Sequence, residues 1–288
     1  MKIADEKAHT ERVRRFYAAI AGGYETEIRR FPYYLTAHKQ YTRCLTAIFE
    51  RPPNGRPARP IQTVVELGAG TGAQTLYLAR HAKQVVSLDL SEDLLRVNQE
   101  KLREQRITNV QLLAGDITRC GLRDGFADCV ISLGDVFSHI ARYEKALQEM
   151  ARLTKPGGIL CFDFDNKWYP QLLWDWAELR RAAATPGQGH VRTWHHLGRS
   201  IDLCTFTQKE IRGLLAKYGF HIDRTYGLDF FTFLTPEACH FGDVQSSLGT
   251  KACYALGWVD RKLSRFFPVN RLGESKLVIA RRVANGAG

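Results

Sequence analysis

The chain has 288 residues, a length that suits one large domain or one domain with a sizeable insertion. Hydrophobic residues make up 44% of it and charged residues 25%, which is ordinary for a globular protein and excludes a disordered or fibrous chain. The formal charge of +11 favours an anionic partner, such as nucleic acid, an anionic membrane surface or an acidic small molecule, unless it only solvates the surface.

The start of the chain is charged and lacks the apolar centre of a secretory signal peptide. No apolar run reaches the length of about 18 residues that a membrane span needs. The seven cysteines include no C-x-x-C pair and no Cys/His spacing typical of a metal site. We therefore expect free thiols, no metal and a reducing, cytoplasmic compartment.

Aromatic and aliphatic residues recur at helical spacing over residues 10–21, and a second helix is expected over residues 34–49. The segment RPPNGRPARP, residues 51–60, is rich in proline and can neither continue a helix nor form a central strand. We therefore expect residues 1–60 to form an N-terminal helical cap and linker, and residues 61–288 to form the main domain.

From residue 63 onward, short apolar runs alternate with amphipathic helical patterns. The pattern predicts strands at residues 63–67, 84–90, 110–116, 127–134 and 158–165, and helices at residues 74–81, 92–105 and 143–153. This order predicts an α/β fold in which helices cover both faces of a parallel sheet.

The alternation breaks after the fifth strand. The later elements that the pattern predicts are helices at residues 208–218 and 250–266 and strands at residues 220–226 and 276–281. Residues 166–205 and 227–273 are otherwise irregular and follow strand ends. Because ligands of α/β proteins bind at strand ends, we expect these two stretches to be insertions that cover a substrate.

The stretch GAGTGA after the first strand matches the fingerprint G-x-G-x-x-A through Gly68, Gly70 and Ala73. Such a turn lets a ligand approach the backbone closely, and Asp89, about twenty residues further on, can accept hydrogen bonds from ribose hydroxyls. NAD and S-adenosylmethionine (SAM) both carry an adenosine, so the turn alone leaves both open. Glu66 favours SAM, because the α-ammonium group of SAM suits an acidic neighbour, whereas the pyrophosphate of NAD does not.

Five segments in this order, ELGAGTG, VVSLDLS, LLAGDIT, LGDVFSHI and LTKPGG, resemble the class I SAM-dependent methyltransferases, most strongly over residues 63–164. The resemblance implies a Rossmann-like, doubly wound sheet of seven strands whose last strand, SKLVIARR, runs antiparallel. It implies SAM as cofactor and S-adenosylhomocysteine as product. The residues expected to bind the cofactor are Tyr17, Tyr24, Glu66, Gly68, Ala69, Gly70, Gly72, Asp89, Leu90, Asp116, Ile117, Leu133 and Gly134.

Two segments indicate the group of methyltransferases. FYAAIAGGYETE, with Tyr17 and Tyr24, is similar to a segment of the ubiquinone/menaquinone C-methyltransferases and of the glycine N-methyltransferase group, where the tyrosines close over the cofactor. LGDVFSHI is similar to a segment of the glycine N-methyltransferase group, although Asp135 stands where that group often has Asn. The resemblance implies that Tyr24, Asp135 and His139 are catalytic, with His139 as a substrate contact or a general base.

The segment FDFDNKWYP follows the fifth strand and predicts substrate contacts from Asn166, Trp168 and Tyr169. Both irregular stretches are rich in aromatic residues, Arg and His, which suits a planar or hydrophobic molecule that carries an anion. The sequence therefore predicts methyl transfer to O, N or C of a small, aromatic or hydrophobic metabolite. Three alternatives remain open: a nucleic-acid methyltransferase, a non-catalytic SAM-binding partner protein and a nicotinamide oxidoreductase.

Overall fold

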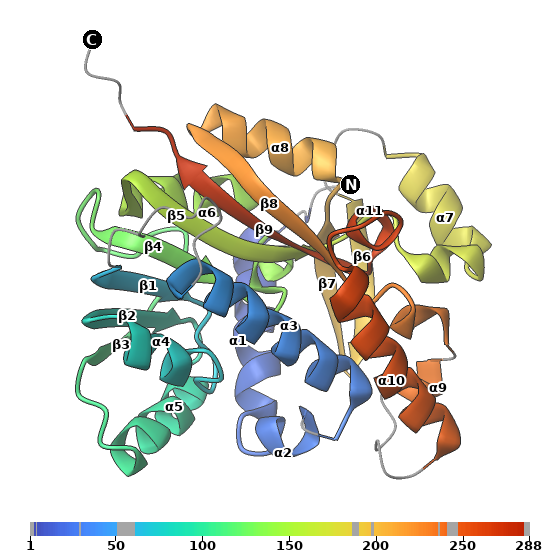
Figure 1. Cartoon of the computed structure of the whole chain (residues 1–288), viewed down its shortest axis with the longest axis horizontal. Coiled ribbons are helices and arrows are strands. Elements are labelled where there is room, and N and C mark those ends of the chain that lie inside the picture. The colour runs from blue at the N-terminus through green and yellow to red at the C-terminus, as the bar shows by residue number, and fades with distance from the viewer. Residues whose placement is uncertain are drawn as a thin grey trace.

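The computed structural model describes residues 3, 5–28, 30–50, 61–185, 190–196, 199–235, 237–240 and 247–284, so the expected linker lies outside the described residues. At its centre is a seven-stranded sheet in the order β3-β2-β1-β4-β5-β9-β8 (Figure 1). The strands are β1 (Thr63–Leu67), β2 (Gln84–Asp89), β3 (Val110–Ala114), β4 (Ala127–Ser132), β5 (Thr154–Asp165), β8 (Phe220–Leu228) and β9 (Ser275–Arg282). β9 alone runs in the direction opposite to the other strands of this sheet, which confirms the predicted fold.

Helices cover both faces of this sheet. They are α3 (Pro32–Phe49), α4 (Thr75–His81), α5 (Glu92–Glu104), α6 (Tyr143–Leu153) and α8 (Gln208–Lys217). Successive residues of a strand point to opposite faces. Val65 accordingly packs in one cluster with Leu147 of α6, whereas Val64 packs in the other with Leu45 of α3. Water is thus excluded from both faces, as a parallel sheet requires.

The N-terminal helices lie at the carboxyl edge of the parallel strands. α1 (Glu6–Ile20) begins earlier than expected, because the side chain of Asp5 accepts a hydrogen bond from the backbone N–H of Ala8 and caps the helix. The short α2 (Tyr24–Ile28) leads into α3. Because α3 shares a hydrophobic cluster with the sheet, the cap is packed onto the core of the main domain. The division at residue 60 remains a prediction.

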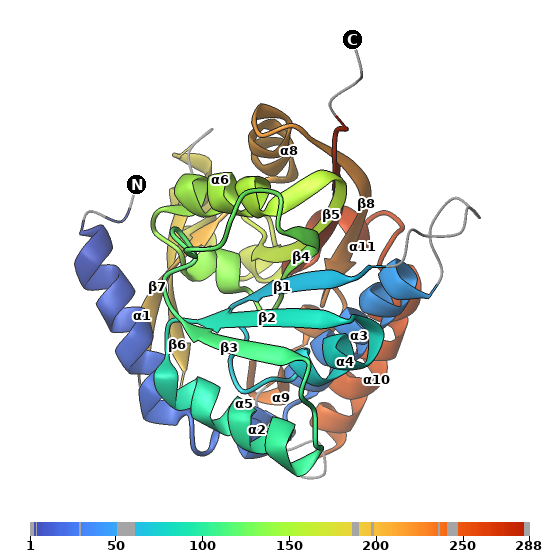
Figure 2. The same cartoon turned by 90° about the vertical axis from the view of Figure 1, so that its left-hand side faces the viewer.

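The first irregular stretch contains a hairpin that the sequence pattern did not predict. Its strands are β6 (His190–His196) and β7 (Arg199–Thr205), preceded by α7 (Trp176–Ala183). β7 lies beside α1 (Figure 2). Ile201 and Leu203 of β7 pack in one hydrophobic cluster with Phe16 of α1. The side chains of β6 are mostly polar. They bond to buried polar partners, where a strand usually packs an apolar face against the core.

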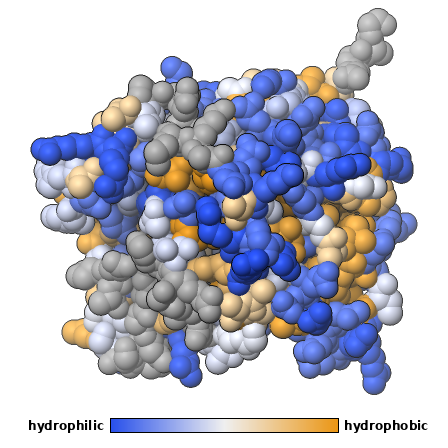
Figure 3. All heavy atoms as spheres, turned by 180° about the vertical axis from the view of Figure 1, so that it is seen from behind, coloured by the Kyte–Doolittle hydropathy of each residue, from blue (hydrophilic) through white to orange (hydrophobic). Residues whose placement is uncertain are grey.

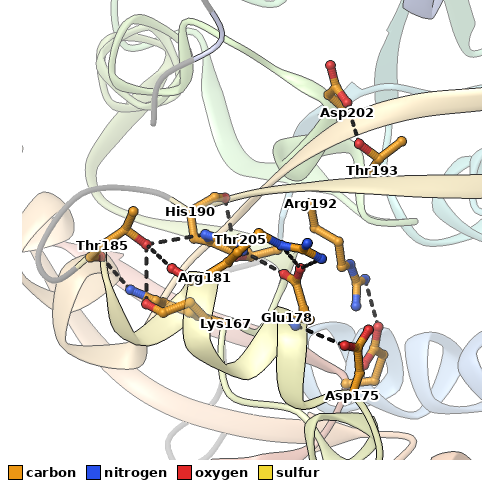
Figure 4. A network of polar contacts seen from close by, with 12 residues as sticks. Lys167, Asp175, Glu178, Arg181, Thr185, His190, Arg192, Thr193, Asp202 and Thr205 are labelled. Atoms are coloured by element: carbon orange, nitrogen blue, oxygen red, sulfur yellow. Dashed lines mark hydrogen bonds and ion pairs between the residues drawn. The ribbon is translucent and has the colours of Figure 1, made fainter.

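These polar partners form the network in Figure 4. Glu178 of α7 accepts hydrogen bonds from Arg181 and bonds to His190 of β6 at 2.6 Å. Lys167 donates to the backbone carbonyl of Thr185 at 2.5 Å. Buried polar groups must find hydrogen-bond partners within the protein, and here the partners lie on different elements. The network therefore joins α7 to the hairpin.

The second irregular stretch is mostly helical, with α9 (Glu237–His240), α10 (Leu248–Leu263) and α11 (Val269–Leu272). α10, close to the predicted helix, lies beside α3 (Figure 1). A Cβ atom on Gly257 would lie 1.9 Å from Cγ2 of Thr36, so the two helices can approach this closely only with glycine there. Asp260 accepts hydrogen bonds from three consecutive backbone N–H groups, residues 230–232, and fixes the chain after β8.

The surface view in Figure 3 shows mostly hydrophilic side chains, with hydrophobic ones gathered in smaller patches between them. Among the described residues, no helix combines the length and the apolar character needed to cross a membrane.

Replacing Leu147 with Ala tests the packing of α6. Leu147 is fully buried, so Leu147→Ala removes apolar contacts and leaves a cavity. We expect the free energy of unfolding to fall by about 2–5 kcal/mol, measured by urea denaturation. The control is Leu173→Ala at a position that is 62% exposed, where the expected change is within about 0.5 kcal/mol. Equal losses in the two variants would contradict this assignment of the core.

Candidate active site

A cavity of about 840 Å³ lies at the carboxyl ends of the parallel strands, beneath α1, α2 and α3. Its volume falls within the range of roughly 300–1,000 Å³ that is typical of small-molecule sites. The residues that line it come from the turn after β1, from the ends of β2, β3 and β4, and from the N-terminal helices. The cavity is thus assembled from segments that are far apart in the sequence.

The turn after β1 depends on glycine at two positions in different ways. Gly68 has a φ of 77°, and a Cβ atom there would lie 2.5 Å from Cγ2 of Val136. Gly70 has a φ of 52°, but a Cβ atom there would have no neighbour within 4 Å. Gly70 lines the cavity, so a ligand can approach the backbone closely at this point.

Two strand-end acids stand on the wall beyond this turn. Asp89 accepts a hydrogen bond at 2.8 Å from each of two backbone N–H groups, those of Gly70 and Ser91. Asp116 accepts from the backbone N–H of Thr118 at 2.8 Å and from Arg142 at 2.6 Å. Each carboxylate oxygen can accept a further hydrogen bond, so both acids remain able to bind a ligand's hydroxyl or amino group.

Glu66 lies behind the turn, outside the residues that line the cavity. It is buried, and its Oε2 accepts hydrogen bonds of 2.6 Å from the hydroxyls of Thr75 and Ser87. Burial raises the pKa of Glu66 to about 7, and these hydroxyls offset part of that effect. In this structure its visible role is to join β1, β2 and the start of α4.

The turn after β4 is held by Asp163 of β5, which is fully buried. Asp163 accepts hydrogen bonds from the backbone N–H groups of Gly134 and Asp135 at 3.1 and 3.0 Å, and from the Tyr41 hydroxyl at 2.5 Å. Asp135 has a φ of 57°, which is unfavourable for a residue other than glycine. The Asp163 carboxylate therefore stabilises a strained turn that presents Asp135 to the cavity.

Beyond this turn, the cavity wall is mainly aromatic. We call this part the tyrosine chamber, and the residues that line it are Tyr17, Tyr24, Tyr33, Tyr34, Tyr41, Asp135 and His139. The Tyr33 hydroxyl donates to Oδ2 of Asp135 at 3.1 Å, and the Tyr17 hydroxyl is 2.8 Å from Nε2 of His139. Burial lowers the pKa of His139 to about 3, so its ring is neutral at pH 7.

The cap is joined to the glycine turn by an ion pair. Glu25 of α2 accepts hydrogen bonds from the hydroxyl of Thr71 and from Lys101 of α5. Lys101 also donates to the backbone carbonyl of Thr71 at 2.6 Å. Burial lowers the pKa of Lys101 to about 8. These contacts hold α2 over the turn that carries Gly70.

The cavity brings together most of the site residues that the sequence predicted. Those that line it are Tyr17, Tyr24, Gly68, Ala69, Gly70, Gly72, Asp89, Leu90, Asp116, Ile117, Leu133, Gly134, Asp135 and His139. Glu66, Asn166, Trp168 and Tyr169 are not among its lining residues. The Asn166 amide donates to the backbone carbonyls of Trp168, Arg271 and Gly273, which fixes the chain after β5. The ring of Tyr169 lies under the guanidinium of Arg192.

Sequence reasoning missed Tyr33, Tyr34 and Tyr41 on α3, and it missed Asp163 as the acid that holds the turn. The segment FPYYLTAHKQY does carry a signal, because it places three tyrosines within the first part of one helix, but their orientation depends on how α3 docks. None of the described residues in the two irregular stretches lines this cavity. The part of the cover that the described residues form comes from α1, α2 and α3, and a cover from the two irregular stretches remains a prediction.

Among the described residues, no group of three or more His, Cys, Asp and Glu side chains is arranged to hold a metal ion. What the cavity offers is an open backbone turn, hydrogen-bond acceptors at two strand ends, and apolar side chains of Leu90, Ile117 and Leu133 between them. This set suits an adenosine-containing ligand, because a ribose needs acceptors and an adenine ring needs apolar contacts.

Comparison with known proteins agrees with the fold. Residues 65–162 match the family described as the methyltransferase domain. A ubiquinone/menaquinone biosynthesis C-methyltransferase, UbiE of Yersinia pestis, is 29% identical over 170 residues, which are 55% of this chain and 66% of that protein. The chain thus matches just under two thirds of the length of these curated relatives.

Two solved structures show the same fold. One is the phosphoethanolamine N-methyltransferase 2 of Haemonchus contortus in complex with phosphomonomethylethanolamine and S-adenosylhomocysteine, with a TM-score of 0.56 and 16% identity over 85% of this chain and 52% of that one. The other is a SAM-dependent methyltransferase of Clostridium acetobutylicum, with a TM-score of 0.53 and 12% identity over 86% of this chain and 92% of that one.

Residues 65–162 thus match a methyltransferase domain, and the sequence motifs and the strand order agree with those of the class I SAM-dependent methyltransferases. SAM is the methyl donor of this family, and S-adenosylhomocysteine is the product formed from it.

Glu66 makes stability depend on pH in a direction that can be measured. Its pKa is about 7 in the folded chain and 4.5 ordinarily, so its contribution is fully present below pH 4.5 and is lost as the pH rises through 7. The loss is on the order of 3 kcal/mol. We expect Glu66→Gln to flatten the fall in the free energy of unfolding between about pH 4.5 and pH 7, measured by urea denaturation. Glu92→Gln, at a largely exposed acid, is the control, and an unchanged slope in Glu66→Gln would contradict the assignment.

Proposed function

We propose that this chain transfers the methyl group of SAM to O, N or C of a small, aromatic or hydrophobic molecule that enters the tyrosine chamber. The observation that carries this proposal is that the glycine turn, the two strand-end acids and the chamber line one continuous cavity. The names of the relatives support a small acceptor, since both the C-methyltransferase UbiE and the Haemonchus contortus N-methyltransferase are named for small molecules.

In this proposal the cofactor lies between the glycine turn and the strand-end acids. The backbone at Gly68, Gly70 and Gly72 holds its methionine part, and Asp89 accepts from its ribose hydroxyls. Asp116 accepts from the adenine amino group, between the apolar side chains of Leu90 and Ile117. Leu133 and Gly134 lie nearest the sulfur. When bound, SAM supplies a methyl group on a positively charged sulfur, and that sulfur keeps the carbon–sulfur electron pair.

The chain's own residues contribute mainly position and exclusion of water. Tyr17 and Tyr24 close the chamber from the cap side, and burial raises the pKa of both, so their hydroxyls stay protonated and donate hydrogen bonds. His139 is a weak proton acceptor, because its pKa is about 3. We therefore assign to His139 the role of holding Tyr17 and the acceptor molecule in place.

The cavity's charge disfavours the nucleic-acid alternative. The acids that line it are Glu25, Asp89, Glu104, Asp116 and Asp135, whereas its lysine and arginine are Lys101 and Arg142. Both of these bases are already paired with acids, at Glu25 and Asp116. Nucleic-acid sites need unpaired positive charge that meets phosphates.

Incubation with methyl-labelled SAM and a cell extract tests the proposal. We expect the label to appear in a low-molecular-weight product that mass spectrometry can identify. Treatment of the extract with RNase and DNase should leave this labelling unchanged. Label found in nucleic acid would favour the nucleic-acid alternative, and SAM binding without any labelled product would favour a non-catalytic partner.

Asp89→Ala should weaken SAM binding by about 1.5–3 kcal/mol, because it removes charge-assisted hydrogen bonds to the ribose. Isothermal titration calorimetry measures this directly. Asp93→Ala, at an exposed acid of α5 that pairs with Arg96, is the matched control and should bind SAM as the parent does. Unchanged affinity in Asp89→Ala would remove Asp89 from the cofactor site.

A further inference from the structure

The tyrosine chamber contains one acid and no described side chain of opposite charge. Asp135 is the acid, and the other residues that define the chamber are five tyrosines and the neutral His139. The lysine and arginine of the cavity, Lys101 and Arg142, pair with Glu25 and Asp116 at the glycine turn and at the end of β3. The chamber therefore holds an acid and no base to neutralise it, although the protein as a whole carries a charge of +11.

Asp135 has a free position for a donor. Its Oδ2 accepts from the Tyr33 hydroxyl and can accept a further hydrogen bond, whereas its buried Oδ1 is not open to the cavity, and the Ser275 side chain lowers the pKa of Asp135. His139, which is 9% exposed, has an unpartnered buried Nδ1. Unpaired buried polar atoms are costly, so a chamber that keeps them is suited to a ligand that supplies the missing partners.

More acids stand behind Asp135. Asp165 and Glu274 are both buried and share Arg192, which donates to Asp165 at 3.2 Å and to Glu274 at 2.8 Å. Each of them keeps one oxygen, Oδ2 of Asp165 and Oε2 of Glu274, without a partner. The charge of Arg192 lowers the pKa of Asp135, but Arg192 is engaged by these two acids and is not among the residues that line the cavity.

The rings around Asp135 also favour a cation. Tyr33 and Tyr34 lie edge to face at 5.0 Å, and Tyr17 and Tyr24 do so at 6.1 Å. The faces of aromatic rings attract ammonium groups, and this attraction grows when water is excluded.

We propose that the acceptor is an amine with an apolar body, which enters the tyrosine chamber as an ammonium ion and is bound by the carboxylate of Asp135 among the tyrosine rings. This inference rests on the proposed function and narrows its acceptor atom from O, N or C to N. It also replaces the anionic substrate that the composition of the irregular stretches predicted, because their residue Arg192 is engaged by Asp165 and Glu274.

The bound ion must lose a proton before its nitrogen can form a new bond. That proton passes from the nitrogen to the carboxylate of Asp135, which becomes a neutral carboxylic acid, and the nitrogen keeps the electron pair. Burial raises the pKa of Asp135, which makes it a better proton acceptor than an exposed aspartate.

The test is a comparison of three compounds with one skeleton: 2-phenylethylamine, 2-phenylethanol and phenylacetate. Each is titrated into the full chain saturated with S-adenosylhomocysteine, by isothermal titration calorimetry. We expect the amine to bind roughly 10-fold or more tightly than the alcohol, because it gains a charge-assisted bond, and the carboxylate to bind most weakly. Failure of the amine to bind, or binding no tighter than that of the alcohol, would overturn the inference.

Variants locate the effect. Asp135→Asn should abolish the preference for the amine over the alcohol, and Tyr33→Phe, which keeps the ring and the carboxylate, should preserve it. Asp93→Asn is the matched control, at an acid of α5 that lies outside the cavity lining and pairs with Arg96, and should leave the preference unchanged at saturating S-adenosylhomocysteine. A preference that survives in folded Asp135→Asn, or disappears in Tyr33→Phe, would also overturn the inference. Loss of S-adenosylhomocysteine binding by the parent chain would instead sink the proposed function.

Discussion

The carboxylate of Asp163 holds together the parts on which the rest of the site depends. It comes from β5, binds two backbone N–H groups of the turn after β4, and receives the hydroxyl of Tyr41 from α3. Without it, two buried N–H groups would have no acceptor, and the left-handed conformation of Asp135 would lose its support. One side chain thus fixes the sheet, the cap and the reactive end of the cavity relative to one another.

Charge is distributed unevenly between the surface and the interior. The chain carries +11, yet the carboxyl edge of its sheet buries Asp135, Asp163, Asp165 and Glu274, and burial raises the pKa of each. Desolvated acids weaken folding unless hydrogen bonds or counter-charges offset the loss. Hydrogen-bond donors offset the cost of burying Asp163, whereas the cost of burying Asp135 is offset only in part. A buried acid of this kind on a cavity wall, as Asp135 is, is typical of a site that binds a ligand.

The sequence allowed the sheet to be predicted almost strand by strand, because a parallel strand buried on both faces leaves a short apolar run that ends at a turn. It also predicted the residues at the ends of β1, β2, β3 and β4, since their order along the chain follows their order at the sheet edge. The hairpin of β6 and β7 was missed, because its polar side chains are satisfied by partners such as Glu178 and Asp165 that are distant in the sequence. The role of α3 was missed for the same reason: a helical pattern reveals that one face is buried, but does not reveal what lies against it.

The cap and the cofactor turn cannot be treated as separate parts. Glu25 binds the side chain of Thr71 while Lys101 binds both Glu25 and the backbone of Thr71, so α2, α5 and the glycine turn share one half-buried ion pair. For α2 to move away from the turn, this pair must break and both charges must be hydrated again. Because these contacts are shared, the position of α2 and the conformation of the turn at Gly70 are coupled.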